Sequence, residues 1–237
     1  MIPDDGRESP AEARTVTRAT TTFKPRRRRL SAARRADLAR WLDRWGVDVE
    51  GPALSWTEVF DDVADLSGVV LDIGFGHGES VQELALRRPE IGVIGVEVHT
   101  AGVATLLDAV VREGLRNVRA VHGDAIRFLD RLPARSLDRV QIFFPDPWPK
   151  AAQQHRRFVR DDTIAALTDR LRIGGVLRMA TDVADYAEQM IAACDAEPRL
   201  VGGVVDDPAD RPPTRFERRG LDEGRSPVDL RYERSER

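Results

Sequence analysis

Residues 69–78 read Val69-Val70-Leu71-Asp72-Ile73-Gly74-Phe75-Gly76-His77-Gly78, and they carry the strongest indication of the fold class. A short apolar run rich in β-branched residues is typical of a buried strand, and the glycines after it indicate a turn into a helix. Glycines at such a turn let a ligand approach the backbone closely. The spacing G-x-G-x-G differs from the dinucleotide fingerprint G-x-G-x-x-G, and Asp72 lies where a carboxylate can meet an ammonium group. The stretch therefore indicates a cofactor loop built on Gly74, Gly76 and Gly78, with a merely tight turn as the alternative.

Outward from this stretch, buried-strand runs alternate with helical patterns. Further strands are expected at residues 91–96, 118–121, 137–144, 176–180, 200–205 and 228–232. Helices are expected from about Ser31 to Gly46, at residues 55–66, up to Arg88, and at residues 101–113, 125–132, 163–171 and 184–196. Ser55 to Glu58 has capping-box spacing, and Gly174-Gly175 is expected to break the helix before it. The alternation predicts an α/β fold whose parallel sheet binds ligands at the carboxyl ends of its strands.

Two further strands end in acidic residues. Glu97 ends the second strand, where a carboxylate can accept both hydroxyls of a ribose. Asp124 and Ala125 follow the third strand, where a carboxylate can accept from an exocyclic adenine amine, or can simply cap the next helix. Together with Asp72 and the glycines, these acids fit one ligand that has an amino-acid end, a ribose and an adenine. That ligand is S-adenosylmethionine.

The fourth strand ends in a proline-rich loop, Phe143-Phe144-Pro145-Asp146-Pro147-Trp148-Pro149-Lys150. Three prolines in five residues stiffen the backbone, so we expect Asp146 and Trp148 to be presented rigidly at the sheet edge. An aromatic ring beside a polar group on a stiff loop suits a planar base, by stacking and edge hydrogen bonds. Basic residues follow directly, at His155-Arg156-Arg157 and Arg160. The alternative is a solvated, proline-rich connector.

Composition excludes several classes of protein. The chain has 237 residues, of which 41% are apolar and 32% charged, and it has one cysteine. It is thus neither wholly disordered nor disulfide-stapled, and the lone cysteine cannot supply a cysteine metal cluster. No run of apolar residues and glycines exceeds six residues, far short of the ~20 that a membrane helix needs. We expect no membrane partner, no metal, and a cytoplasmic location.

Charge is distributed unevenly along the chain. The net charge is −3, yet residues 14–44 hold 11 basic and two acidic side chains, a local charge of +9. A basic arm on a mildly acidic protein indicates contact with a polyanion, with a solubilising tail as the alternative. Residues 1–22 lack periodicity and are expected to be a disordered tail, and residues 23–237 to be one domain with an N-terminal helical extension.

Several motifs together resemble those of the bacterial tRNA (guanine-N7)-methyltransferases. They are the Leu71–Ser80 stretch, Gly95-Val96-Glu97-Val98-His99, the loop from Phe144 to Lys150, Ala180-Thr181-Asp182 and Thr214-Arg215-Phe216-Glu217, in the family's order. The proline loop is the most specific of them, because general methyltransferases lack it. The chain departs from the family pattern at Asp72, Val183 and Arg225, where Glu, Trp and His are common.

The resemblance implies a fold, a reaction and a set of roles. It implies a class I, S-adenosylmethionine-dependent methyltransferase fold, a mostly parallel seven-stranded sheet with an antiparallel last strand. It implies methylation at N7 of the guanine at position 46, in the variable loop of tRNA. The methyl donor is expected to contact Asp72, Gly74, Gly76, Gly78, Glu97, Asp124, Ala125 and Asp146. Asp146 is expected to be catalytic, and the tRNA is expected to contact Lys150, Asp182, Thr214, Arg215, Phe216 and Glu217.

Other readings remain open from the sequence. The same fold could act on another RNA base, or the chain could be a non-catalytic RNA-binding adaptor. A dehydrogenase is disfavoured by the glycine spacing and by Asp72. No obligate protein partner is expected, and the chain is expected to be a monomer or a homodimer.

Overall fold

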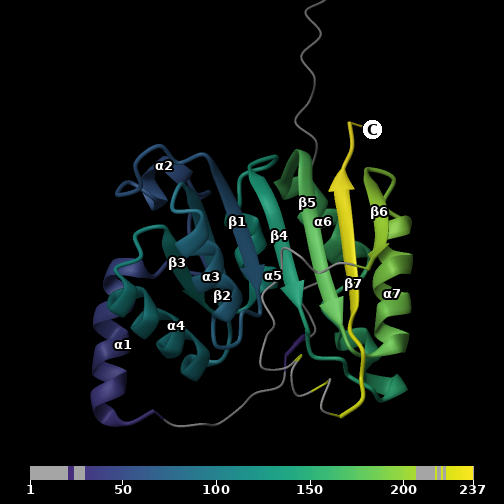
Figure 1. The fold of residues 1–237 in the computed structure, drawn as a ribbon, viewed down its shortest axis with the longest axis horizontal. Coiled ribbons are helices and arrows are strands. Elements are labelled where there is room, and N and C mark those ends of the chain that lie inside the picture. The colour runs from purple at the N-terminus through teal and green to yellow at the C-terminus, as the bar shows by residue number, and fades with distance from the viewer. Residues whose placement is uncertain (1–20, 24–29, 207–216, 218–219, 221–222, 237) are drawn as a thin grey trace, which may run out of the picture.

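Seven strands form one sheet in the order β3-β2-β1-β4-β5-β7-β6 in the computed structural model (Figure 1). The structure describes residues 21–23, 30–206, 217, 220 and 223–236. The strands are β1 (Gly68–Ile73), β2 (Ile91–Glu97), β3 (Val118–His122), β4 (Leu137–Phe143), β5 (Leu171–Thr181), β6 (Leu200–Val205) and β7 (Val228–Arg234). β7 runs antiparallel to both of its neighbours, whereas the other pairings are parallel. The predicted fold class is confirmed, down to the antiparallel last strand.

Helices cover both faces of the sheet because its central strands are apolar on both sides. They are α1 (Ala32–Trp45), α2 (Trp56–Val59), α3 (Glu79–Arg87), α4 (Thr100–Glu113), α5 (Ala125–Phe128), α6 (Asp161–Arg170) and α7 (Ala184–Asp195), with short 3₁₀ helices η1 (Leu129–Arg131) and η2 (Ala151–Arg156). One apolar cluster joins α1, α3 and α4 to β2 and β3, and a second joins α5, α6 and α7 to the other face. Buried strands of this kind are typical of doubly wound sheets.

The N-terminal extension packs as part of the domain. Helix α1 begins after Ser31, whose side chain accepts a hydrogen bond from the Arg34 amide, and Gly46 follows its last residue. Leu38 is buried against α4, and Gly46 pairs with Ala120 of β3. The predicted helix is therefore confirmed, and it covers one edge of the sheet.

Two local predictions were wrong. The helix expected at residues 55–66 is only the single turn of α2, and Ser55 makes no capping hydrogen bond. Phe60 ends that turn and packs so tightly over Gly92 that a Cβ there would lie 2.6 Å from its ring. Tertiary packing of Phe60 thus overrides the helical pattern. Gly174-Gly175 does not break α6, which has already ended at Arg170; the pair lies inside β5, beside a shift in its register with β4.

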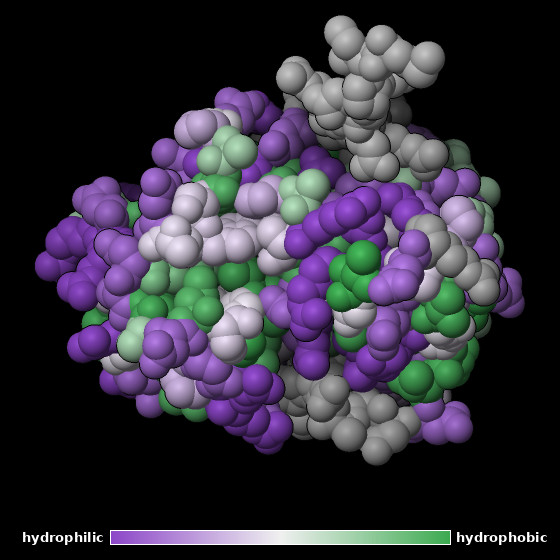
Figure 2. Space-filling model, turned by 90° about the horizontal axis from the view of Figure 1, so that it is seen from above, coloured by the Kyte–Doolittle hydropathy of each residue, from purple (hydrophilic) through white to green (hydrophobic). Residues whose placement is uncertain are grey.

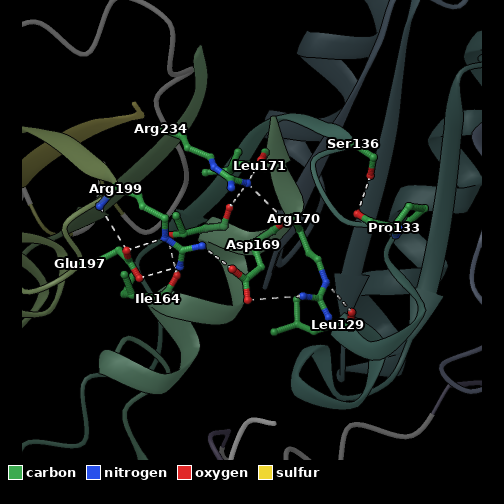
Figure 3. A network of polar contacts seen from close by, with 11 residues as sticks. Leu129, Pro133, Ser136, Ile164, Asp169, Arg170, Leu171, Glu197, Arg199 and Arg234 are labelled. Atoms are coloured by element: carbon green, nitrogen blue, oxygen red, sulfur yellow. Dashed lines mark hydrogen bonds and ion pairs between the residues drawn. The ribbon is translucent and has the colours of Figure 1, made fainter. Parts of the chain in front are cut away.

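The amino edge of the sheet carries a network of ion pairs and hydrogen bonds (Figure 3). Arg199 lies between Asp169 and Glu197, and its Nε donates to Glu197 Oε1 at 2.7 Å. Arg234 donates to the Thr168 carbonyl at 2.8 Å, and Arg170 to the Leu129 carbonyl at 3.3 Å. These residues tie the start of β5, the start of β6 and the end of β7 together.

The surface at the amino edge of the sheet is mixed in hydropathy. Figure 2 looks onto the amino edge, where hydrophilic residues are mixed with smaller apolar areas. The carboxyl ends of β1, β4 and β5 lie at the opposite edge, at the bottom of Figure 1.

In the described part of the chain, no helix is both long enough and apolar enough to span a membrane.

Candidate active site

A cavity opens at the carboxyl edge of the sheet, where a parallel sheet is expected to bind its ligand. Its walls come from the glycine loop after β1, the ends of β2 and β3, the loop after β4, and a short N-terminal segment. The residues that line it are Thr22, Phe23, Ile73, Gly74, Gly76, His77, Val96, Glu97, Val98, His99, Thr100, Ala101, Gly102, Gly123, Asp124, Ala125, Ile142, Phe144, Pro145, Asp146 and Phe158. Segments that are distant in the sequence thus meet around one space.

Two of the three glycines in the loop after β1 line the cavity, and their contact with a cofactor stays a prediction. Gly74 and Gly76 have φ values of +74° and +61°, which favour glycine, and both line the cavity. Gly78 also has a positive φ, of 85°, but it does not line the cavity. A Cβ at Gly78 would lie 2.8 Å from Leu106, so this glycine allows α3 to pack closely on α4. The loop therefore leaves its backbone exposed to a ligand at two of the three glycines.

Asp72 lies behind the loop rather than in the cavity wall. It is 1% exposed, and its Oδ2 accepts hydrogen bonds from Ser80 Oγ at 2.6 Å and Gln141 Nε2 at 3.2 Å. Burial, and to a smaller extent the charge of Glu97, raises the pKa of Asp72 to about 6 against these two hydrogen bonds. A buried carboxylate whose partners are neutral favours a cation nearby.

Glu97 is held rigidly at the end of β2. Its Oε2 accepts from the Gly76 amide and its Oε1 from the His99 amide, each at 2.9 Å. The side chain is 5% exposed and lines the cavity. A carboxylate oxygen can accept more than one hydrogen bond, so Glu97 retains the capacity to bind a pair of hydroxyls.

Asp124 is both a helix cap and a cavity-lining residue, and its contact with an adenine stays a prediction. Its Oδ1 accepts from the Ile126 amide at 2.9 Å, so it caps α5. Its side chain also lines the cavity, beside Ala125. Partial burial raises the pKa of Asp124, and the hydrogen bond from Ile126 opposes that shift. The cap fixes the orientation of a carboxylate that a ligand can reach.

The loop after β4 places Asp146 in the cavity wall. Phe144 and Trp148 flank it with φ values of +52° and +44°. Left-handed backbone at bulky residues costs on the order of 1–3 kcal/mol each, and it persists where the surroundings enforce it. The Phe144 amide donates to the Ala180 carbonyl at 2.8 Å, which continues the β4–β5 pairing into the loop. The stiffness predicted from the prolines is thus accompanied by strain on both sides of Asp146.

Trp148 is not placed as predicted. It is 3% exposed, its Nε1 donates to the Thr22 carbonyl at 3.0 Å, and the Arg156 guanidinium lies 3.7 Å from its ring centroid. In this structure its ring therefore has no exposed face on which a base could stack. The reason is that the N-terminal segment and η2 both pack against the indole.

The second basic patch also differs from the prediction. Arg157 is 2% exposed, and it donates to the Pro147 carbonyl at 2.8 Å and pairs with Asp185 at 2.6 Å. Arg160 pairs with Asp162 at 2.8 Å. These arginines anchor the loop and the start of α6 instead of forming a solvated basic face.

The residues predicted to contact RNA are only partly described. Lys150 is exposed at the end of the proline loop, outside the cavity wall. Asp182 follows β5, and its Oδ2 accepts from Arg225 Nε at 2.6 Å. Glu217 is buried, whereas Thr214, Arg215 and Phe216 lie outside the described residues. None of the three described residues of this set, Lys150, Asp182 and Glu217, lines the cavity.

Some lining residues were missed by sequence reasoning. His77 and His99 follow strand ends, so their position at the carboxyl edge was a signal that could have found them. Thr22 and Phe23 had no such signal, because they lie about fifty residues before the glycine loop and outside any periodic pattern. Thr21 and Thr22, which the sequence places in the tail, contact Arg156 and Trp148. Residues 1–20 lie outside the described residues.

Solved structures share this architecture. The aminoglycoside resistance methyltransferase NpmB1 matches with a TM-score of 0.51 and 18% identity, over 76% of this chain and 94% of that one. The antibiotic-resistance methyltransferase Kmr matches with a TM-score of 0.52 and 19% identity, over 77% and 94%. At such low identity these matches show the fold alone.

Proteins related to this chain by sequence have a higher identity to it than these solved structures do. Residues 67–230 match a family model described as "Putative methyltransferase". A protein of Streptomyces avermitilis named tRNA (guanine-N(7)-)-methyltransferase is 40% identical, over 98% of this chain and 81% of its own length. One of Acidithiobacillus ferrooxidans with the same name is 41% identical, over 93% and 97%. With its fold, its cavity and these near full-length matches, the chain belongs to the tRNA (guanine-N7)-methyltransferase family.

Proposed function

We propose that this chain transfers the methyl group of S-adenosylmethionine to N7 of a guanine in tRNA, and that the guanine lies in the variable loop. The observation that carries the proposal is that Glu97, Asp124 and Asp146 line one cavity beside an open glycine loop. The relatives' names supply the substrate class. Since tRNA is its substrate, we place the protein in the cytoplasm.

The residues present fit the methyl donor. Gly74 and Gly76 leave backbone open to its amino-acid end, and Asp72 supplies negative charge from behind that loop. Glu97 would hold the ribose hydroxyls, and Asp124 with Ala125 would hold the adenine. When bound, S-adenosylmethionine supplies an electrophilic methyl group on a positively charged sulfur. Three carboxylates at one end of the fold favour such a cationic ligand.

The chain has no need to supply a general base. Guanine N7 carries an exposed lone pair and has no proton to lose. The residues therefore act by positioning the base in line with the donor and by electrostatics. The guanine ring becomes cationic as it is methylated, so carboxylates beside it stabilise charge that develops only in the transition state.

We assign this role to Asp146, which lines the cavity, and to Asp182, which is paired with Arg225 at the end of the neighbouring strand. β4 and β5 are parallel neighbours with Phe143 opposite Ala180, so the two aspartates follow adjacent strand ends. A carboxylate there can also accept from guanine N1–H and the exocyclic amine, which would hold the base. We infer that Asp146 is the catalytic residue and that Asp182 assists in holding the guanine, with Lys150, Thr214, Arg215, Phe216 and Glu217 on the RNA side.

One experiment tests this function directly. The purified protein is incubated with methyl-labelled S-adenosylmethionine and unmodified bulk tRNA, and the digested RNA is analysed by mass spectrometry. We expect labelled 7-methylguanosine, and chain cleavage at that nucleoside should map it to the variable loop. Another labelled nucleoside would overturn the target base. Donor binding without any label would favour the non-catalytic adaptor.

A further inference from the structure

A three-residue N-terminal segment, Thr21–Phe23, is seated between the proline loop and the donor cavity. Trp148 Nε1 donates to the Thr22 carbonyl at 3.0 Å, and Arg156 Nε donates to the Thr21 carbonyl at 2.9 Å. Thr22 is only 8% exposed. In Figure 1 the segment is the short purple piece below the end of β4. Two side chains of one region thus hold two successive carbonyls of a segment more than 120 residues away.

Two arginines support this contact, one at the indole and one in the loop that carries it. Arg156 binds the segment and also lies over the Trp148 ring, 3.7 Å from its centroid. Arg157 holds the loop from within the protein, because its Nε donates to the Pro147 carbonyl. Trp148 itself adopts a left-handed φ of +44°, which costs energy and persists because the surroundings enforce it. The indole is therefore held through its N–H by the Thr22 carbonyl and over its ring by Arg156.

Thr22 and Phe23 face the same cavity as the donor-site residues. Both line it together with Gly74, Glu97, Asp124 and Asp146. The other walls belong to strand ends and to loops that the sheet holds in place. The outer wall instead depends on a segment that is tied to the domain by side chains of the proline-loop region.

We propose that Trp148 and Arg156 are positioning residues that hold Thr21–Phe23 as a wall of the S-adenosylmethionine site. The inference rests on the proposed function, because it takes the cavity to be the donor site. It assigns to Trp148 a role in donor binding in place of base stacking. The same loop then shapes both sides of the reaction, since Asp146 faces the base and Trp148 closes the donor site.

The test compares two Trp→Phe variants of the full chain by calorimetric titration with S-adenosylmethionine. Trp148→Phe keeps a ring under Arg156 but loses the N–H to Thr22. Trp56→Phe is the matched control, because within the described residues the buried Trp56 Nε1 has no hydrogen-bond partner. We expect Trp148→Phe to weaken donor affinity about three- to tenfold, the range for one lost hydrogen bond, and Trp56→Phe to leave it unchanged.

A second variant and two further readouts separate this role from a structural one. Phe23→Ala removes part of the wall without touching the loop, and it should weaken donor affinity by a similar factor. In Trp148→Phe, KM for S-adenosylmethionine should rise while kcat and KM for tRNA stay near wild type. Hydrogen exchange at residues 21–23 should slow when the donor binds to the wild type, and should slow less in Trp148→Phe.

The outcomes distinguish the two proposals. Unchanged donor affinity in both Trp148→Phe and Phe23→Ala would overturn this inference and leave the proposed function standing. If Trp148→Phe lowered both kcat and the melting temperature but left donor affinity unchanged, Trp148 would have only a structural role. Failure of the wild-type chain to bind S-adenosylmethionine would overturn the proposed donor site and this inference with it.

Discussion

The two edges of the sheet use charged side chains in different ways. At the amino edge, Asp169 and Glu197 share Arg199, and these groups stay within reach of solvent or of each other (Figure 3). At the carboxyl edge, Asp72 is buried with Ser80 and Gln141 as its hydrogen-bond partners. Among the described residues, neither Asp72 nor Asp124 forms an ion pair. The first arrangement is complete within the protein, whereas the second favours a cation from outside.

The difference shows where the protein accepts a cost in stability for function. Ion pairs near the surface contribute little each, typically up to about 1 kcal/mol. A buried carboxylate without a cation lowers the stability of the folded state unless it is protonated. Titratable groups with a perturbed pKa cluster at functional sites, and Asp72 lies directly behind the glycine loop. The same Asp→Asn substitution should therefore have opposite consequences at the two edges.

The largest effect is expected for Asp146→Asn. Loss of the carboxylate charge beside the reacting base should lower kcat about 100- to 1000-fold, the range for removing one preorganised electrostatic contact. Donor affinity should change little, because the glycine loop, Glu97 and Asp124 remain. Single-turnover methylation and calorimetry measure the two quantities, with Asp169→Asn as the control. Turnover near wild type would leave Asp146 with a purely structural role in the loop.

Asp72→Asn should weaken binding of the methyl donor and stabilise the ligand-free protein. The amide can still accept from Ser80 and Gln141, but it presents no charge to the donor's ammonium group, so we expect affinity to fall about tenfold, or about 1.4 kcal/mol. The pKa of Asp72 rises from 3.8 to about 6, and two units correspond to at most about 3 kcal/mol of lost stability at neutral pH. The melting temperature of the variant should therefore be several degrees higher at pH 7.5.

The stability gained by Asp72→Asn should depend on pH in a definite direction. The pKa of Asp72 is higher in the folded state than in the unfolded state, so as the pH rises the unfolded state loses this proton first. The penalty is absent below about pH 4, grows between about pH 4 and 6, and is complete above pH 6. The difference in melting temperature between Asp72→Asn and wild type should shrink accordingly at pH 4.5. A variant that is less stable at pH 7.5 would show that the neighbours already compensate the charge.

Asp169→Asn should do the reverse at the amino edge. Arg199 loses one of two carboxylate partners, and both side chains of the broken pair are 23% exposed. We expect a loss of about 1 kcal/mol in unfolding free energy, seen as a lower urea midpoint, with donor affinity unchanged. The loss should diminish at high salt. An effect on donor affinity would contradict the separation of the two edges.

The smallest effect is expected for Lys150→Ala. Lys150 is exposed and lies outside the cavity wall, so stability and donor affinity should stay the same. If it contacts a tRNA phosphate, the plot of log affinity against log salt should lose about one unit of slope. Filter binding with tRNA over a range of salt concentrations measures it, and Arg112→Ala, on the exposed face of α4, is a control for general loss of charge. An unchanged slope would remove Lys150 from the interface.

Much of the site could be predicted because its parts are local. Glu97 follows an apolar run directly, and Asp124 follows the next strand after Gly123. The carboxyl ends of parallel strands meet at one edge of the sheet whatever their side chains contact. The position of a residue at a strand end does not tell how deeply its side chain is buried, and Asp72 lies behind the cavity wall. Nor does it say which of two local roles wins, and Asp124 has both, as a helix cap and as part of the cavity wall.

The failures have one physical cause. Helix α2 stops after a single turn because Phe60 packs on Gly92, and no pattern within residues 55–66 contains that contact. In the sequence Arg157 belongs to a basic run, which predicts a solvated side chain. Its guanidinium instead lies inside the protein against Pro147 and Asp185. Charge and periodicity describe a segment by itself, whereas burial depends on what packs against it.

The α/β class could be predicted from the alternation of strand and helix patterns along the chain, and the glycine loop and the acids at the strand ends from spacing within about ten residues. The position of the Trp148 side chain and the identity of the outer wall depend instead on the tertiary structure. The hydrogen bonds that seat Thr21 and Thr22 span 135 and 126 residues. Partners so far apart are brought together by the packing of the whole domain, and neither segment alone carries a signal for the other.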